Sequence, residues 1–136
     1  MATLADVLAR HPGAQSFSFG DSQEMALELA ELVISGAKRA TCGRLSDYPE
    51  GAADRPVPGR RDVVTDHHGA PLAVIETVEV TECRFDEIGM DFALAEGEND
   101  DLEGWRRDHR RYFERNGGWS PDMLLLCERF RLVAVL

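Results

Sequence analysis

The spacing of apolar residues changes period along this chain, and this constrains its fold more than any other feature. Between 22 and 35, apolar side chains recur every three or four residues, which predicts an amphipathic helix that ends at Gly36. From Met123 to Leu136 they recur at every second residue, which predicts a long strand. Several strands with intervening helices make an α+β fold, expected here as a small barrel or curled sheet.

The remaining segments also alternate between predicted helices and predicted strands. Residues 2–10 are expected to form a short helix, and 16–19 a short strand. Asp21 or Ser22 offers an N-cap for the amphipathic helix, with Glu24 placed for a capping box against Asp21. Further elements are expected as a strand after Thr41, a long loop at 49–61, strands at 61–66 and 71–83, helical turns at 85–95, and a helix from Asp100 or Asp101 to about Arg115.

Charge and length narrow the class of partner. The 136 residues are expected to form a single domain, 1–136. A net charge of −10 argues against duplex DNA, because phosphate neutralisation supplies most of the affinity for a duplex. No apolar run approaches the roughly 20 residues of a membrane span, and no basic-then-apolar leader opens the chain.

Cysteine usage points to a reduced environment. Cys42, Cys83 and Cys127 are odd in number and widely spaced, which suggests neither a disulfide framework nor a zinc site. We therefore expect a cytoplasmic protein without a bound metal or cofactor. His67 and His68 lack partners at ligand spacing and are expected in a surface turn.

Lys38 stands out because the other fourteen basic residues are all arginine. Lysine loses its proton when it is desolvated, whereas arginine does not, so Lys38 is a candidate base. It lies in the turn Gly36–Thr41, where Lys38 would serve as base or as a cation for an oxyanion and Thr41 as nucleophile or hydrogen-bond donor. The alternative is an ordinary lysine on a solvated turn.

Three further features offer candidate chemistry. Glu96 and Glu98 precede the cap of the helix that ends near Arg115, so helix capping does not explain them. His109 shares a helix face with apolar residues, which fits a buried, hydrogen-bonded histidine or one that lines a site. Glu128 falls in the apolar row of the last strand, where it either neutralises a cation at the edge of the core or acts as a site acid.

The order of these motifs resembles the ASCH family of PUA-like domains. The resemblance covers about 17–133, which would be the core of the domain, and it rests on the following motifs in order: Phe19-Gly20-Asp21, Gly36-x-Lys38-x-x-Thr41, Pro58-Gly59, Ala95-Glu96-Gly97-Glu98, Leu102-x-x-Trp105-x-x-x-His109-x-x-x-Phe113, Asp122-Met123 and Cys127-Glu128-Arg129-Phe130. The chain departs from relatives at Asn99, where they often carry glycine. The family implies a small β-barrel with flanking helices and a cleft beside the Lys38 turn.

The resemblance also implies a chemistry. Some family members resemble small amidohydrolases that remove the acyl group from acetylated cytidine with a lysine, a threonine and a glutamate. The matching positions are Lys38, Thr41 and Glu98, the last chosen over Glu96 by alignment. Other members are reported as metal-dependent ribonucleases, in which the same lysine and a serine near Ser120 would matter. Substrate contacts are expected from Arg39, Arg106, His109, Arg110, Ser120 and Glu128.

Three functions follow as alternatives. The first is an amidohydrolase that acts on an acylated nucleoside, with Lys38 as the base. The second is a module that binds or cleaves single-stranded RNA. Its phosphates would be held by Lys38, Arg106 and Arg110, and its bases would stack on Tyr48 or Trp119. The third is a regulator that senses a modified nucleoside without catalysis. Self-association into a homodimer is open in each.

Overall fold

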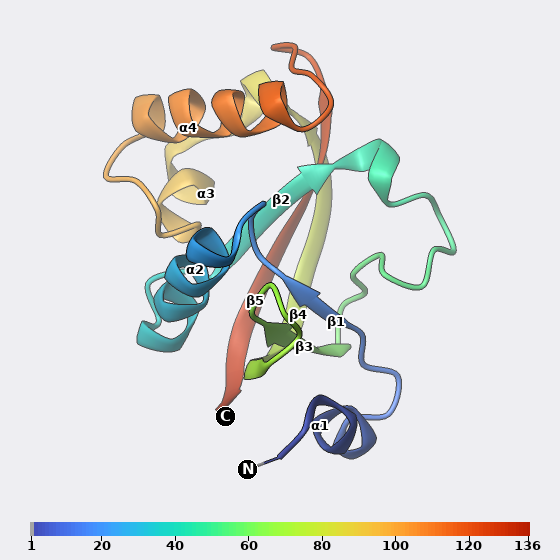
Figure 1. Ribbon diagram of the computed structural model, residues 1–136. Coiled ribbons are helices and arrows are strands. Elements are labelled where there is room, and N and C mark those ends of the chain that lie inside the picture. Colours follow the sequence, from blue (N-terminus) through green and yellow to red (C-terminus); the bar gives the residue numbers. More distant parts are fainter. Residues whose placement is uncertain (1) are drawn as a thin grey trace.

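The computed structural model describes residues 2–136 and has five strands and four α-helices in that range (Figure 1). The strands are β1 (Ser16–Ser18), β2 (Ala40–Arg44), β3 (Arg61–Thr65), β4 (Pro71–Arg84) and β5 (Leu124–Val135). The helices are α1 (Leu4–Arg10), α2 (Gln23–Ser35), α3 (Met90–Ala95) and α4 (Leu102–Arg115), with 3-10 turns η1 (Leu45–Asp47) and η2 (Phe85–Glu87). The α+β class expected from the sequence is therefore correct.

The sheet is mixed, and its strands run in the order β1-β3-β4-β5-β2. Its centre is the long antiparallel ladder between β4 and β5, with β3 and β2 antiparallel on either side and β1 parallel to β3. β1 and β2 stand at opposite ends of this order, and no ladder joins them within residues 2–136. The expected barrel is thus not closed. The curled, open sheet leaves its two edges free to form the walls of a cleft.

Helix α2 shows how local sequence sets the element that precedes the site. Ser22 is its N-cap and accepts a hydrogen bond from the backbone N–H of Met25. Gly36 ends the helix in the left-handed region, at φ 86°. The capping box expected between Asp21 and Glu24 does not form, because Asp21 instead binds Arg115 at the end of α4.

Three apolar clusters hold the helices on the sheet. One lies between α2 and the sheet, around Leu29, Ile75 and Phe130. A second joins α3 and α4 to β5 around Trp105, which is fully buried, and the third holds α1 on β3 and β4. Figure 1 shows α2, α3 and α4 on one side of the long strands, with the loop after β2 on the other. No helix in residues 2–136 is long and apolar enough to cross a lipid bilayer.

Candidate active site

Lys38 is a buried cation. The turn after α2 is closed by a hydrogen bond from the backbone N–H of Lys38 to Leu32 O at 3.0 Å, and the Lys38 side chain is 0% exposed. Its Nζ donates to Glu96 O at 3.3 Å, to Glu96 Oε1 at 3.1 Å and to Glu98 Oε2 at 2.7 Å. An ammonium has three N–H donors, so these contacts occupy all of them.

Glu96 is the acid that organises the site. It ends α3, and its carboxylate accepts hydrogen bonds from Lys38, from Trp105 Nε1 at 2.8 Å and from His109 Nε2 at 3.3 Å. The His109 ring stacks on Trp105 with centroids 4.2 Å apart, and its Nδ1 contacts Trp105 O at 2.9 Å. Alignment with the family favoured Glu98 over Glu96, so the role of Glu96 as the shared partner of Lys38, Trp105 and His109 was not predicted. The signal was present, since an indole N–H and an imidazole on one buried helix face both need a partner.

Gly97 lets the acidic loop approach the Lys38 turn. Its φ is +76°, and an added Cβ would lie 2.3 Å from Ala37 O. The adjacent backbone is tied to the turn by a hydrogen bond from Arg39 N–H to Ala95 O at 2.7 Å. Only a residue without a Cβ fits this contact at a positive φ, so glycine is what allows Glu96 and Glu98 to reach Lys38.

These contacts set the charge states. Burial alone would lower the pKa of Lys38, but the charges of Glu96 and Glu98 outweigh it and raise that pKa above its usual value. Burial would raise the pKa of Glu96, but Lys38 and His109 hold it well below its usual range. The pKa of His109 is raised, because the charge of Glu96 outweighs the effect of burial. Lys38 is therefore a fixed cation, which argues against the expected role as a base.

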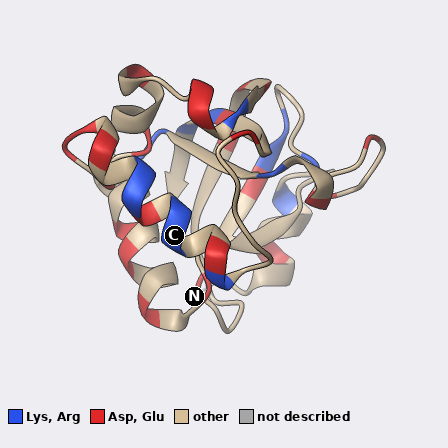
Figure 2. Ribbon diagram, turned by 90° about the horizontal axis from the view of Figure 1, so that it is seen from above, with Lys and Arg blue, Asp and Glu red and all other residues tan. Residues whose placement is uncertain are grey.

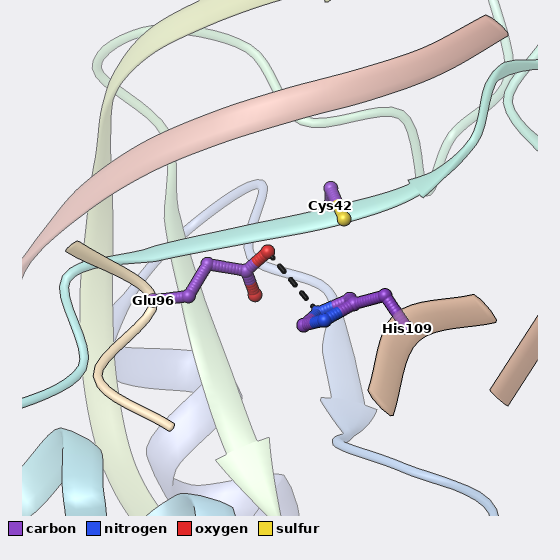
Figure 3. Close-up of side chains that lie close together, drawn as sticks. All are labelled: Cys42, Glu96 and His109. Carbon is purple, nitrogen blue, oxygen red and sulfur yellow. Dashed lines mark ion pairs between the residues drawn. The ribbon is translucent and has the colours of Figure 1, made fainter. Parts of the chain in front are cut away.

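Cys42, Glu96 and His109 lie close together, and Figure 3 shows the Glu96 and His109 side chains pointing toward each other from α3 and α4. Their potential ligand atoms all lie within 4.8 Å of one another. Burial raises the pKa of the Cys42 thiol well above its usual value, so without a bound cation Cys42 is a neutral thiol. The Glu96 carboxylate already accepts three hydrogen bonds. Glu96 and His109 thus form part of a buried hydrogen-bonded cluster beside Cys42.

Two adjoining cavities meet at Thr41. A side pocket of about 90 Å³ is lined by Lys38, Glu96, Glu98 and His109 among others. A large cleft of about 560 Å³ opens between β1, β2, the loop after β2 and α4. Thr41 lines both. Lys38, Thr41 and Glu98, the three residues expected to act together, all line the side pocket.

Glu128 borders the large cleft on the side of β5. It is 8% exposed and lies directly opposite Thr41 in the ladder between β2 and β5. Its Oε2 accepts a hydrogen bond from Thr77 Oγ1 at 2.7 Å. Burial raises the pKa of Glu128, and the hydrogen bond from Thr77 only partly offsets this. The direct partner of Glu128 is thus the hydroxyl of Thr77. The direct contact with a cation, which was one of the two alternatives from the sequence, is not formed within residues 2–136.

Comparison with known proteins identifies the family. The profile of the ASCH domain matches residues 15–134. The chain belongs to the ASCH domain family. It is 31% identical to an ASCH domain from Lactobacillus crispatus JV V101, with 93% of this chain and 83% of that chain covered at a TM-score of 0.80. It is 35% identical to protein EF3133 from Enterococcus faecalis V583, with 90% and 77% covered at a TM-score of 0.78.

More distant likeness concerns the fold alone. ASCH from Zymomonas mobilis shares 10% identity with this chain, with 91% of this chain and 73% of that chain covered at a TM-score of 0.59. No curated protein matches the sequence. The family and its α+β architecture are thereby established, and the chemistry of this ASCH domain is argued from its own residues.

The large cleft of this ASCH domain carries an excess of acid. Four acidic residues line it: Asp47, Asp54, Asp62 and Glu128. Its two basic residues are already bound to protein acceptors. Arg60 pairs with Asp62 at 3.0 Å, and Arg44 donates to Asn116 O and Gly118 O. The cleft therefore favours an uncharged ligand over a phosphate.

Four expected contact residues lie elsewhere in the ASCH domain. Arg39 is exposed, and its Nε donates to Gly36 O, while Ser120 donates to Asp122; neither lines the cleft or the side pocket. Arg106 and Arg110 line a separate depression of about 460 Å³ on the outer face of α4. They are not gathered with Lys38 because the helix turns them away from the face that carries His109.

That depression is the basic surface of the molecule, and Figure 2 shows its two basic turns on α4. Its charged lining residues are Arg106, Arg107, Arg110, Arg111, Asp86 and Glu114. Arg110 pairs with Glu114 and Arg107 with Asp108, each at 3.3 Å, which leaves Arg106 and Arg111 as the arginines of this depression without an ion pair in residues 2–136. The Arg110 guanidinium lies 4.1 Å from the centre of the Trp119 ring. Tyr48 and Trp119, the two aromatic residues expected to stack bases, are thus divided between the acidic cleft and this basic surface.

Proposed function

We propose that this ASCH domain is an amidohydrolase that removes the acyl group from the exocyclic nitrogen of an acylated cytidine-type nucleoside. The observation that carries the proposal is the position of Thr41, at the junction of an acid-rich cleft and the pocket of the Lys38–Glu98 ion pair. A hydroxyl there can attack an acyl carbon whose base and ribose occupy the cleft.

The roles follow from the contacts. Thr41 is the nucleophile, and no residue within 2–136 engages its hydroxyl in a hydrogen bond that would hold it away from a ligand. Lys38 positions Glu98 through the 2.7 Å contact, which leaves the other carboxylate oxygen of Glu98 for the amide N–H of the substrate. Glu98 is the half-buried member of this ion pair, with 19% of its side chain exposed against 0% for Lys38. This assignment keeps the three expected residues but makes Lys38 a positioning residue.

The character of the cleft supports a nucleoside. Its volume of about 560 Å³ falls in the range typical of small-molecule sites. Phe17, Phe19, Tyr48 and Tyr112 provide aromatic walls for a planar base. The unpaired acids Asp47 and Asp54 suit ribose hydroxyls and repel phosphate.

The test uses the purified chain with N4-acetylcytidine, with released cytidine measured by chromatography. We expect turnover in the wild type, retained activity in Thr41→Ser, and a loss in Thr41→Ala of about a thousandfold or more. Thr81→Ala is the matched control, because Thr81 is exposed on β4 and lines neither cavity. Absence of turnover in the wild type, or equal activity of the two alanine variants, would overturn the proposal.

The basic surface of α4 supports a second candidate function, the binding of single-stranded RNA. Four arginines and a stacked tryptophan gather there in a chain whose net charge is −10. Arginines on phosphates and an aromatic ring on bases are the usual means of binding single strands. This candidate uses a surface separate from the cleft, so the two functions are compatible.

A further inference from the structure

We propose that Glu128 is the general base that takes the proton from Thr41 as Thr41 attacks the acyl carbon. This inference rests on the proposed amidohydrolase function and names the residue that completes it. The register of the sheet between β2 and β5 places Thr41 and Glu128 directly opposite each other.

Cross-strand position brings the two side chains within reach. Residues opposite each other in an antiparallel pair have Cβ atoms about 4.5–5.5 Å apart on the same face. Both residues line the large cleft, so this shared face is the one that meets the ligand. Thr77 binds Oε2 of Glu128, and within residues 2–136 no hydrogen bond engages Oε1. One carboxylate oxygen is held in place while the other is free to accept a proton.

The other titratable groups near Thr41 are committed elsewhere. Lys38 has no free N–H and carries a full charge, so it has no lone pair to offer. Both ring nitrogens of His109 are occupied, by Glu96 and by the Trp105 carbonyl. Glu98 is held in an ion pair with Lys38 at 2.7 Å. Asp47, Asp54 and Asp62 also line the large cleft, but Glu128 is the acid that stands directly opposite Thr41 in the ladder.

The surroundings of Glu128 suit a proton acceptor. Burial raises its pKa, and the nearby charge of Asp62 acts in the same direction. The hydrogen bond from Thr77 and the charges of Arg60 and Lys38 act against burial without cancelling it. Tyr48, across the cleft, is a neutral phenol whose own pKa is raised, first by burial. A carboxylate whose pKa is moved toward neutrality is a stronger base than an ordinary one.

The reaction balances with these groups and one water. Thr41 Oγ forms a bond to the acyl carbon, and its proton passes to Glu128. The C–N bond then breaks, and the proton moves from Glu128 to the departing amino nitrogen, which leaves an acyl ester on Thr41. Water attacks this ester, gives one proton to Glu128, and releases the carboxylic acid. The proton on Glu128 returns to Thr41 Oγ. The net change is amide plus water to amine plus acid.

The first test compares Glu128→Gln with Glu31→Gln in hydrolysis of N4-acetylcytidine. Glutamine keeps the shape of Glu128 but cannot take a proton, so kcat should fall by about 10²–10⁴-fold. Glu31 is exposed on α2 and lines neither cavity, so its variant should match the wild type. The wild-type kcat/KM should decline on the acid side with a midpoint above the usual glutamate pKa of about 4.3. The residual activity of Glu128→Gln should lack that decline.

A second variant separates catalysis from folding. Glu128→Ala leaves space for a small acid, so added formate should restore turnover in proportion to its ionised fraction, whereas a purely structural role would not respond. Two results would overturn the assignment of Glu128 as base while leaving the proposed function intact. One is a kcat of Glu128→Gln within about threefold of an active wild type. The other is a folded Glu128→Ala variant that formate does not rescue. Absence of wild-type turnover would overturn the proposed function and this inference together.

Discussion

The contacts of Lys38 explain why one lysine stands among fourteen arginines. A compact ammonium places three N–H groups on Glu96 and Glu98 in a space with no exposure to water. A guanidinium is planar and carries five donors, so it would leave buried N–H groups without partners here. The unusual residue was detectable from the sequence, but the reason for it was not. Its two acidic partners lie about sixty positions away and meet it only in the folded chain.

Substituting Lys38 tests this ion pair directly. Lys38→Met keeps the length of the side chain and removes its charge, which leaves the buried Glu96 carboxylate without its cation. Breaking a buried pair in this way costs about 3–5 kcal/mol. Denaturant unfolding should show that loss for Lys38→Met and almost none for Arg39→Met. Arg39 is the next residue along the chain, and its side chain is exposed. Equal stability of the two variants would contradict the account of Lys38.

The pair formed by His109 and Glu96 predicts a pH dependence of stability. The folded-state pKa of His109 is raised above its unfolded value, because the charge of Glu96 outweighs burial. The stabilisation is therefore complete below pH about 6.5 and is lost as pH rises through the folded-state pKa. Denaturant unfolding between pH 6 and 9 should show a decline in the wild type that is shallower in His109→Gln. His67→Gln, on an exposed turn, should follow the wild type. Parallel curves for all three proteins would refute the coupling.

The elements show how far local sequence determines this fold. Local sequence predicts α2, α4, β4 and β5 to within one or two residues. The period of apolar residues indicates α2 and β5, an aspartate N-cap indicates α4, and a run of β-branched residues indicates β4. The capping box at Asp21 was a local expectation that failed, since Arg115, 94 residues away, binds that carboxylate. Glu96 and Glu98 show the same limit. Helix capping explained neither acid in the sequence. Only the packing of α3 against the Lys38 turn shows that Glu96 is the buried acid and Glu98 the more accessible one.

Gly97 is the element-scale test of that packing. An alanine there would place a Cβ 2.3 Å from Ala37 O at a φ of +76°. Steric strain of this kind costs at least about 2 kcal/mol and pushes the acidic loop away from Lys38. Thermal unfolding should therefore show a clear loss in Gly97→Ala and little change in Gly89→Ala, since nothing lies within 4 Å of a Cβ at Gly89. A Gly97→Ala variant as stable as Gly89→Ala would contradict the close approach.

At the scale of the whole molecule, the acid-rich cleft and the arginine cluster of α4 lie in different places. The cleft between the free edges of the sheet is acidic, and the outer face of α4 carries the arginine cluster. The sequence could not show this division, since it depends on which face of α4 meets the core and on strand pairing across long separations. The same long-range pairing decides that the sheet stays open, which alternation within each strand does not specify.

Salt dependence separates the two surfaces. Nucleoside binding in the acidic cleft releases few counterions, so its affinity should change little between 50 and 500 mM salt. For single-stranded RNA on α4, log affinity should fall by about 0.7 per phosphate contact per log unit of salt. Fluorescence titration should show that Arg106→Gln and Arg111→Gln reduce this slope while Arg10→Gln, exposed on α1, does not. RNA affinity that is insensitive to salt and to both variants would remove the second candidate function.

In the proposed reaction, Thr41, which lines both the Lys38–Glu98 pocket and the acidic cleft, is the nucleophile that carries the acyl group. The most direct measurement is the mass of the intact protein, quenched in acid during turnover of N4-acetylcytidine and followed by peptide mapping. If Thr41 is the nucleophile, we expect one added acetyl group on Thr41 in the wild type and none in Thr41→Ala. Steady release of cytidine by the wild type with no acetyl group on any residue, in rapid-quench samples taken before the first turnover is complete, would contradict it.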